Sequence, residues 1–348
     1  EVVEDLESRE LGEPATSSWS TDFLVRTGES REELGKWLRN RAVPWKRRRR
    51  LIQVVTDTFP CGGWLHKIGR RATAECELCR RSKENSEGGA QGVVPTESIG
   101  HIQSAGCAGQ SEAVTAAHNK CIRDLMGDIQ VHRKKKSNLT FLTMEEEHTI
   151  STLWEQDGCS EICSKEELWQ AAKSDEMQIQ LRGGDDVSCA SEQQYEERFW
   201  RRRLDGIALD SVGKKCYLIE FKRTRDRRHS YEERAMKVAR QQYKSLLSGL
   251  QAVGQQKGWK VEQLVFVGGT CGSVNVETFN QNLKLLEVPE GKWSRLRQRM
   301  ARRLLEEQDK VLRAYFAQKY DKTPTCVDGG GDAAGPKGLA HLSRDVYA

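Results

Sequence analysis

Two short apolar-rich runs, at residues 205–210 and 215–222, constrain the fold more than any other part of the chain. Between them stands Ser-Val-Gly-Lys, which is typical of a turn. The second run contains Cys-Tyr-Leu-Ile at 216–219, the most strand-like stretch in the sequence. The pattern therefore predicts a β-hairpin whose second strand is largely buried.

Helices and one further strand are expected around this hairpin. A charged helix is predicted over 192–203, a long helix over 231–253 and an arginine-rich closing helix over 293–320. The Leu-Val-Phe-Val run at 264–267 predicts a strand over 261–268, of the kind found in the middle of a sheet. The order helix, two strands, helix, strand predicts a mixed sheet flanked by helices.

The chain has 348 residues, of which 37% are hydrophobic and 31% are charged, so it can bury one or two modest cores. Before the hairpin, apolar residues at helical spacing predict helices over 44–58 and 111–129. A helical first part followed by an α/β domain places the chain in the α+β class. The expected boundaries are a flexible lead-in at 1–20, a helical region at 21–137, a connecting segment at 138–191, the α/β domain at 192–322 and a disordered tail at 323–348.

Basic residues are gathered in short runs, although the net charge of the whole chain is only +5. Such runs are typical of proteins that contact the phosphate backbone of nucleic acids. The alternative interpretation is that each run is the solvated face of a helix. The runs for which we predict nucleic-acid contacts are Lys46, Arg47, Arg48, Arg49 and Arg50, and Arg133, Lys134, Lys135 and Lys136.

The cysteines favour an intracellular, reducing environment. Their number, eleven, is odd, the chain is long, and no leading hydrophobic segment directs secretion, so reduced thiols are expected. No stretch reaches the ~18 apolar residues of a membrane helix, so no membrane partner is expected. The first residue is Glu1 and not Met, which suggests a fragment of a longer translation product.

Carboxylates occur on both strands of the expected hairpin. Asp205 opens the first strand and Glu220 lies near the end of the second, and Lys222 leaves the same face of the sheet as Glu220. Two carboxylates and the backbone carbonyl of residue 221 can hold Mg²⁺ or Mn²⁺, while the lysine can orient or deprotonate water. The residues therefore favour metal-assisted phosphodiester hydrolysis, and the alternative is a solvated hairpin.

A group of cysteines and a histidine has the spacing of a zinc site. Cys76 and Cys79 form a CxxC pair, and His101 and Cys107 follow at a distance that can complete tetrahedral Zn²⁺ coordination. His118 and Cys121, one helical turn apart, are alternative ligands. The remaining alternative is that all of these residues are unliganded members of an ordinary core.

Two parts of the chain resemble the C-terminal region of site-specific non-LTR retrotransposon proteins. One part resembles their restriction-like endonuclease, a member of the PD-(D/E)xK superfamily, although Leu204 stands where that family has proline. The other part resembles their linker and CCHC zinc knuckle. The matching stretches are 202–205, 217–222 and 237–243 for the endonuclease, and 64–70, 76–79, 98–103, Cys107 and 117–119 for the knuckle.

The resemblance implies roles for individual residues. Asp205 and Glu220 correspond to metal ligands, Lys222 or Lys237 to the lysine near the water, and Tyr243 to a supporting helix residue. A further carboxylate from residues 196–197 is an open alternative to a purely surface role for that pair. The expected fold is a helical linker with a zinc knuckle in 21–137 and a restriction-endonuclease-like α/β domain in 192–322.

The implied activity is that of an endonuclease that nicks target DNA for target-primed reverse transcription. Its expected partners are target DNA, element RNA and a reverse transcriptase domain upstream in the same polyprotein, and its expected location is the nucleus. No Tyr/Phe-x-Asp-Asp polymerase motif occurs in this sequence. The alternatives are a catalytically inactive remnant that only binds nucleic acid and a stand-alone PD-(D/E)xK nuclease.

Overall fold

The structure is a computed structural model of the chain, which forms two compact units. The first unit comprises Glu1–Lys36 and Thr115–Gln308, and the second comprises Trp37–Val114 and Asp309–Ala348. The lead-in expected at 1–20 and the tail expected at 323–348 lie outside the described residues. The structure describes residues 28–55, 59–84, 93–104, 106–143, 149–155, 159–182, 191–225 and 231–320.

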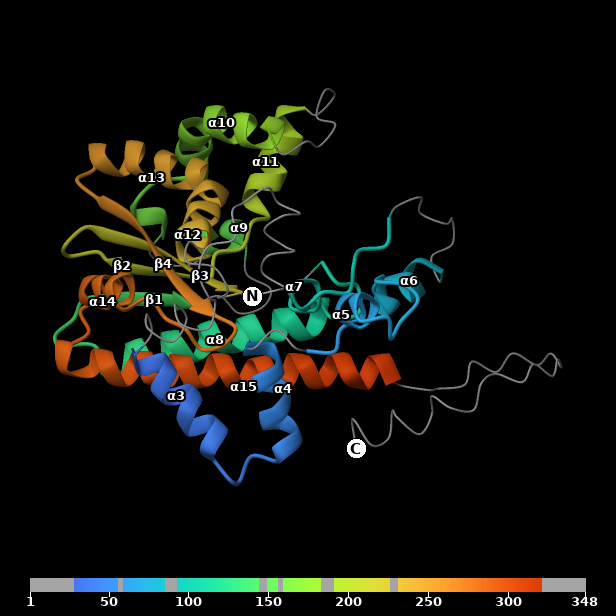
Figure 1. Ribbon diagram of the computed structural model, residues 1–348. Coiled ribbons are helices and arrows are strands. Elements are labelled where there is room, and N and C mark those ends of the chain that lie inside the picture. Colours follow the sequence, from blue (N-terminus) through green and yellow to red (C-terminus); the bar gives the residue numbers. More distant parts are fainter. Residues whose placement is uncertain are drawn as a thin grey trace. The chain divides into compact units, whose positions relative to one another are not determined.

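A four-stranded sheet forms the centre of the first unit (Figure 1). Its strands lie in the order β1 (Thr140–Thr143), β2 (Gly206–Asp210), β3 (Lys215–Thr224) and β4 (Lys260–Gly269). The pairs β1–β2 and β2–β3 are antiparallel, whereas β3 and β4 are parallel. The predicted hairpin, the predicted strand at 261–268 and the α+β class with a mixed sheet are therefore confirmed.

Helices cover both faces of this sheet, because alternate strand residues are apolar on both sides. Ile207 and Leu218 lie in one core, and Ala208 and Phe221 lie in the other. The first core is closed by α9 (Ile150–Glu155), η1 (Cys159–Glu161), α10 (Lys165–Arg182), α11 (Glu192–Trp200) and α13 (Lys244–Gln256). The second is closed by α8 (Ser111–His132), α14 (Val276–Leu285) and the first part of α15 (Trp293–Tyr320), which the short helix η2 (Glu290–Lys292) precedes.

Two segments differ in kind from the sequence-based prediction. The long helix expected over 231–253 is two helices, α12 (Tyr231–Gln242) and α13, which meet at Tyr243. Tyr243 leaves the helical conformation and buries its ring, and its hydroxyl donates to the Arg203 carbonyl. The segment 138–191, expected to be a connection, instead supplies β1, α9 and α10 to the first unit, because its apolar residues pack into the first core.

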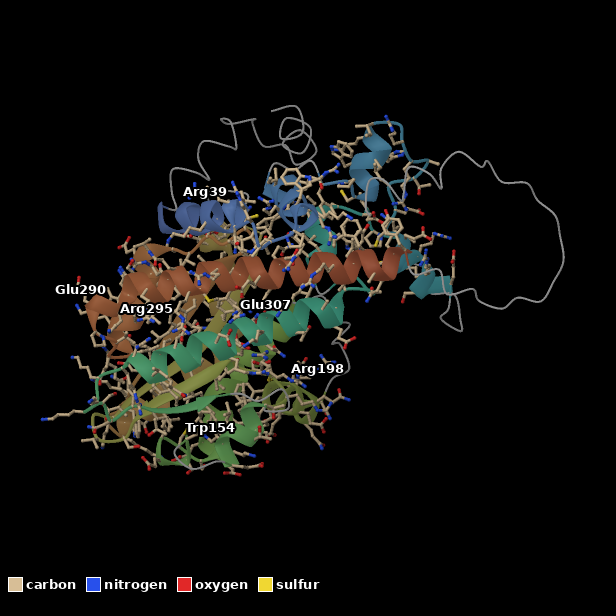
Figure 2. All side chains as sticks on the ribbon, turned by 90° about the horizontal axis from the view of Figure 1, so that it is seen from below. Arg39, Trp154, Arg198, Glu290, Arg295 and Glu307 are labelled. Atoms are coloured by element: carbon tan, nitrogen blue, oxygen red, sulfur yellow. The ribbon has the colours of Figure 1, made fainter. Side chains whose placement is uncertain are left out.

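Ion pairs join α8 to the first part of α15, which run side by side in both views (Figures 1 and 2). Arg299 lies 2.8 Å from Asp128, and Arg303 pairs with Asp124. Figure 2 labels Glu307 farther along α15, where its side chain is buried. The predicted closing helix over 293–320 is confirmed with the same bounds.

Short helices make up most of the second unit. They are α4 (Trp45–Val55), α5 (Gly62–Lys67), α6 (Glu77–Glu84) and α7 (Ile99–Ile102), together with the last part of α15; α3 (Gly28–Arg39) crosses from the first unit into the second. Glu75 and Thr96 form an isolated antiparallel bridge, which brings the chain before α6 next to the chain before α7.

A buried glutamate joins these pieces. Glu97 accepts hydrogen bonds from the Gly62 N–H and the Tyr315 hydroxyl, each at 2.6 Å. Lys319 Nζ lies 2.6 Å from the same carboxylate and Arg71 lies 3.2 Å from it. Burial opposes the ionisation of Glu97, but Lys319, Tyr315 and Arg71 outweigh burial and hold the pKa of this carboxyl below its usual range.

Replacing this carboxylate is expected to destabilise the second unit. Glu97→Gln should lower the free energy of unfolding by about 3 kcal/mol, because the partly buried Lys319 would lose its counter-ion and Arg71 would be left with the more distant Glu77, at 3.7 Å. A depressed folded pKa means that the stabilisation is present above the unfolded pKa and is lost as the pH falls through the folded pKa. Urea titrations should therefore show a difference near neutral pH that shrinks in acid.

Glu84→Gln is the matched control, because the Glu84 side chain is 57% exposed and pairs with the half-buried Arg80. Its effect should stay below about 0.5 kcal/mol. Equal stability of Glu97→Gln and Glu84→Gln at neutral pH would contradict a stabilising role for the buried carboxylate.

Candidate functional site

The predicted acidic pair lies at one end of the β2–β3 hairpin. In the register of these strands, Gly206 pairs with Ile219, so the next position outward places Asp205 beside Glu220. Asp205 immediately precedes β2, and Glu220 lies within β3. The structure therefore brings together the two carboxylates that the sequence analysis proposed as metal ligands.

Both oxygens of Asp205 have partners. The Phe221 N–H donates to Oδ2 at 2.6 Å, and His118 Nε2 lies 3.0 Å from Oδ1. The His118 ring also packs against the Phe221 ring, with 5.5 Å between their centroids. His118 was considered only as a zinc ligand or a core residue, so its contact with Asp205 is a feature that the sequence reasoning missed.

Glu220 is deeply buried, at 3% exposure. Lys222 Nζ lies 2.5 Å from Oε1, whereas Oε2 is buried and has no hydrogen-bond partner among the described residues. Burial, and then the negative charge of Asp205, raise the pKa of Glu220 to about 7, and Lys222 only partly offsets them. A cation between the two carboxylates would relieve both effects.

Lys222 is held by a short chain of hydrogen bonds. Its ammonium donates to Gln242 Oε1 at 2.7 Å, and Gln242 Nε2 donates to the Tyr243 hydroxyl at 3.0 Å. The pKa of Tyr243 is raised by burial and by the negative charges of Glu220 and Asp205, so the phenol remains protonated. Tyr243 thus lies beside the acidic pair, and Gln242 is a second residue that the sequence reasoning missed.

Of the two candidate lysines, the structure brings Lys222 to the carboxylates. Lys237 lies on the exposed face of α12, where it lines a hollow of about 350 Å³ together with Arg240, Gln241 and Lys244. Lys237 and Arg240 share one face of α12, Lys244 opens α13, and Glu233 lines the same hollow. The position of Lys237 therefore favours contact with an anionic partner over a role at the carboxylates.

The carboxylates of residues 196–197 have local partners on α11. Glu196 accepts a hydrogen bond from Trp200 Nε1 at 3.2 Å, and Glu197 lies 3.7 Å from Arg201. These contacts favour the surface interpretation of both residues.

The four residues of the predicted zinc site converge in the second unit. The candidate ligand atoms of Cys76, Cys79, His101 and Cys107 all lie within 4.8 Å of one another. Cys76 Sγ lies 3.8 Å from Cys107 Sγ, and Cys79 Sγ lies 3.2 Å from His101 Nε2. Ser98 caps α7 by accepting the His101 N–H at 3.1 Å, which fixes the backbone of the histidine. This cluster can hold a zinc ion.

The thiols of this cluster cannot all ionise without a cation. A hydrogen bond with Cys107 lowers the pKa of Cys76 to about 5. The pKa of Cys107 is raised by the same hydrogen bond and then by burial, while burial is the main cause of the raised pKa of Cys79. One thiolate therefore disfavours the next, and Zn²⁺ would remove this penalty.

The alternative ligands do not belong to this group. His118 contacts Asp205, and Cys121 is fully buried in the core that includes Ile122 and Leu125. Among the residues that the structure describes, the group of four is the one set of His, Cys, Asp or Glu ligands found close enough to share a metal ion. The structure thus favours His101 and Cys107 over His118 and Cys121.

Some of the predicted nucleic-acid contacts are used within the protein. Arg47 lies 2.6 Å from the buried carboxylate of Asp309, and Arg50 lies over the Phe316 ring. Arg133 lies over the Phe141 ring. These arginines are at least partly engaged in contacts within the protein, and nucleic-acid binding by the two runs stays a prediction. The residues of the runs that are exposed are Lys46, Arg49, Lys134, Lys135 and Lys136.

Comparisons with protein-family models, with curated proteins and with solved structures found no match to this chain. Within the part of the chain that the structure describes, no helix combines the length and the apolar character needed to cross a membrane.

Proposed function

We propose that this chain is a metal-dependent DNA endonuclease that nicks target DNA for target-primed reverse transcription, as part of a non-LTR retrotransposon polyprotein. One observation carries the proposal: Asp205 and Glu220 lie next to each other at the end of the hairpin, and one buried oxygen of Glu220, beside Lys222, has no hydrogen-bond partner in the part of the chain that the structure describes. Burying a carboxylate in this way is costly unless it has a ligand to bind.

The donor set fits Mg²⁺ or Mn²⁺, because both are hard cations that prefer carboxylate oxygens. Asp205 and Glu220 would hold the ion, which supplies Lewis-acid stabilisation of the scissile phosphate and a more acidic bound water. Lys222, fixed by Gln242, would place a positive charge and a hydrogen-bond donor next to the attacking water. Tyr243 stays protonated, and its hydroxyl oxygen accepts a hydrogen bond from Gln242 Nε2, which fixes the Gln242 amide.

The zinc knuckle is proposed as a nucleic-acid positioning element. Three thiols and one imidazole within 4.8 Å of one another suit Zn²⁺ in closed tetrahedral coordination. Such a site has no open position for a substrate, so the role is structural and not catalytic. The resemblance of this region to the retroelement CCHC knuckle supports the same role, with target DNA and element RNA as partners.

The proposed place in the retrotransposon product rests on that resemblance. A reverse transcriptase upstream in the same polyprotein would extend the 3′ end released by the nick, and the chromosomal target would place the reaction in the nucleus. Each competing function can be told apart from this proposal by one observation. An inactive remnant would bind nucleic acid without cutting it, and a stand-alone nuclease would have no polymerase in its gene.

A plasmid assay tests the activity. Supercoiled DNA incubated with the purified chain and Mg²⁺ should become nicked, and a chelator should abolish the reaction. Asp205→Ala and Lys222→Ala should each be strongly impaired, whereas Lys237→Ala should retain most of the nicking rate because Lys237 lies on the exposed face of α12. Nicking that persists in both Asp205→Ala and Lys222→Ala would exclude this site.

The basic side chains of the hollow on α12 and at the start of α13 are expected to contact the DNA backbone. Changing Lys237, Arg240 and Lys244 together to alanine should flatten the slope of log K against log salt concentration by about 2 to 3, since each phosphate contact contributes about 0.9. DNA-binding isotherms at several salt concentrations measure this slope. Lys284→Ala, on the exposed face of α14, is the control. An unchanged slope in the triple variant would show that these side chains do not bind phosphates.

A further inference from the structure

We propose that His118 is a positioning residue that orients the Asp205 carboxylate for metal binding. The proposal rests on the proposed nuclease function and adds a residue from α8 to the site. His118 Nε2 lies 3.0 Å from Asp205 Oδ1.

Asp205 needs external support, because the backbone does not fix its side chain. It lies immediately before β2 and follows residues 202–204, which belong to no helix or strand. Glu220, in contrast, lies within β3, where its neighbours on both sides are paired with β4. The Phe221 N–H fixes one oxygen of Asp205, and His118 contacts the other. The two contacts together define the plane of the carboxylate.

His118 comes from a rigid element. Helix α8 buries Cys121 and Leu125 in the core of the first unit, and Asp124 pairs with Arg303. The imidazole is also packed against the ring of Phe221, the residue whose N–H holds the other oxygen of Asp205. Because packing fixes the His118 ring on this helix, its hydrogen bond can hold the Asp205 carboxylate in one orientation.

The chemistry of the pair gives His118 the role of donor. An ionised aspartate only accepts hydrogen bonds, so Nε2 carries the hydrogen. Donors that orient metal-binding carboxylates and imidazoles act through those ligands, and their removal costs about 10- to 100-fold in metal affinity or activity. His118 is expected to act in this way without touching the substrate.

Two substitutions separate donation from packing. His118→Phe keeps an aromatic ring next to Phe221 but removes the donor, whereas His118→Gln places an amide N–H close to the position of Nε2. Nicking is measured as a function of Mn²⁺ concentration with zinc-loaded protein. His118→Phe should raise the concentration for half-maximal nicking about tenfold or more, and His118→Gln should restore most of the loss. His132→Phe, near the other end of α8, is the control for the same change on the same helix.

The outcomes are distinct. A metal dependence of His118→Phe equal to that of the wild type would overturn the proposal. Equal defects in His118→Phe and His118→Gln would also overturn it, because packing alone would then explain the effect. If His118→Phe does not fold, His118→Asn replaces it, since the asparagine side chain is too short for its amide to reach Oδ1. A higher Mn²⁺ concentration for half-maximal nicking in His118→Asn than in His118→Gln would support the proposal. Equal concentrations in the two variants would overturn it.

Failure of the nuclease assignment would be visible separately. A wild-type chain that nicks no DNA in any divalent metal would remove the proposed function. Mn²⁺ binding to the zinc-loaded protein, measured by electron paramagnetic resonance, would then decide the role of His118 alone. Weaker binding in His118→Phe than in His118→Gln supports it, and equal binding by the two variants and the wild type refutes it.

Discussion

Glu220→Gln is expected to slow DNA nicking by about a thousandfold, the scale reached when one electrostatic stabiliser of a transition state is removed. The change preserves the shape of the side chain and removes its charge. Oε2 of Glu220 is buried and has no hydrogen-bond partner among the described residues, and a neutral amide in its place would bind a divalent cation more weakly and could not neutralise its charge. Initial rates of plasmid nicking at saturating Mg²⁺ measure the effect.

Glu262→Gln is the matched control for this experiment. Glu262 lies on the adjoining strand β4 and pairs with the exposed Lys260 at 2.5 Å, so its charge has no part in the site. The control should nick at the wild-type rate. In the absence of metal, Glu220→Gln should melt no earlier than the wild type, since burial disfavours the charge that the variant removes. Wild-type nicking by Glu220→Gln would end the assignment of this carboxylate.

Local sequence patterns predicted β2, β3 and β4, because the cause of these strands is local, whereas the short edge strand β1 was missed. The run at 216–219 is apolar on both faces, and the structure buries it completely between two layers of helices. The break between α12 and α13 has a different cause. Tyr243 leaves the helix because its hydroxyl reaches the carbonyl of Arg203, which is 40 residues earlier in the chain. A period of 3.6 residues carries no information about such a contact.

Residues of the candidate sites were likewise predictable where their arrangement is set by neighbours in the sequence, and not where it depends on distant residues. Glu220 and Lys222 were predictable, because a separation of two residues on one strand fixes a common face. His118 was not, since its partner Asp205 is 87 residues away and its spacing within α8 is also typical of a core residue. The ion pair of Arg47 was not predictable for a related reason: its counter-ion, Asp309, is 262 residues away in the sequence.

Cys76→Ser is expected to abolish zinc binding and to unfold the knuckle region. Zinc-loaded wild-type protein should carry about one ion per chain, because the cluster offers a full set of four ligands. Zinc binding contributes about 10–16 kcal/mol in small zinc-finger peptides. That is as large as the ~5–15 kcal/mol by which whole domains are stable. Loss of zinc would therefore remove more stabilising free energy than the packing of the knuckle region can supply. Limited proteolysis should cut between residues 59 and 107 first.

Cys121→Ser is the matched variant that distinguishes the group of four from the alternative ligands His118 and Cys121. The same atom is replaced in a fully buried cysteine outside the cluster of four, so the variant loses some core packing but should keep its zinc. Elemental analysis of both purified variants gives the zinc content directly. Loss of zinc in Cys121→Ser with retention in Cys76→Ser would reverse the assignment. Zinc absent from the wild type itself would leave the four side chains as members of a core, in which the Cys76 thiolate would have to be tolerated without a cation.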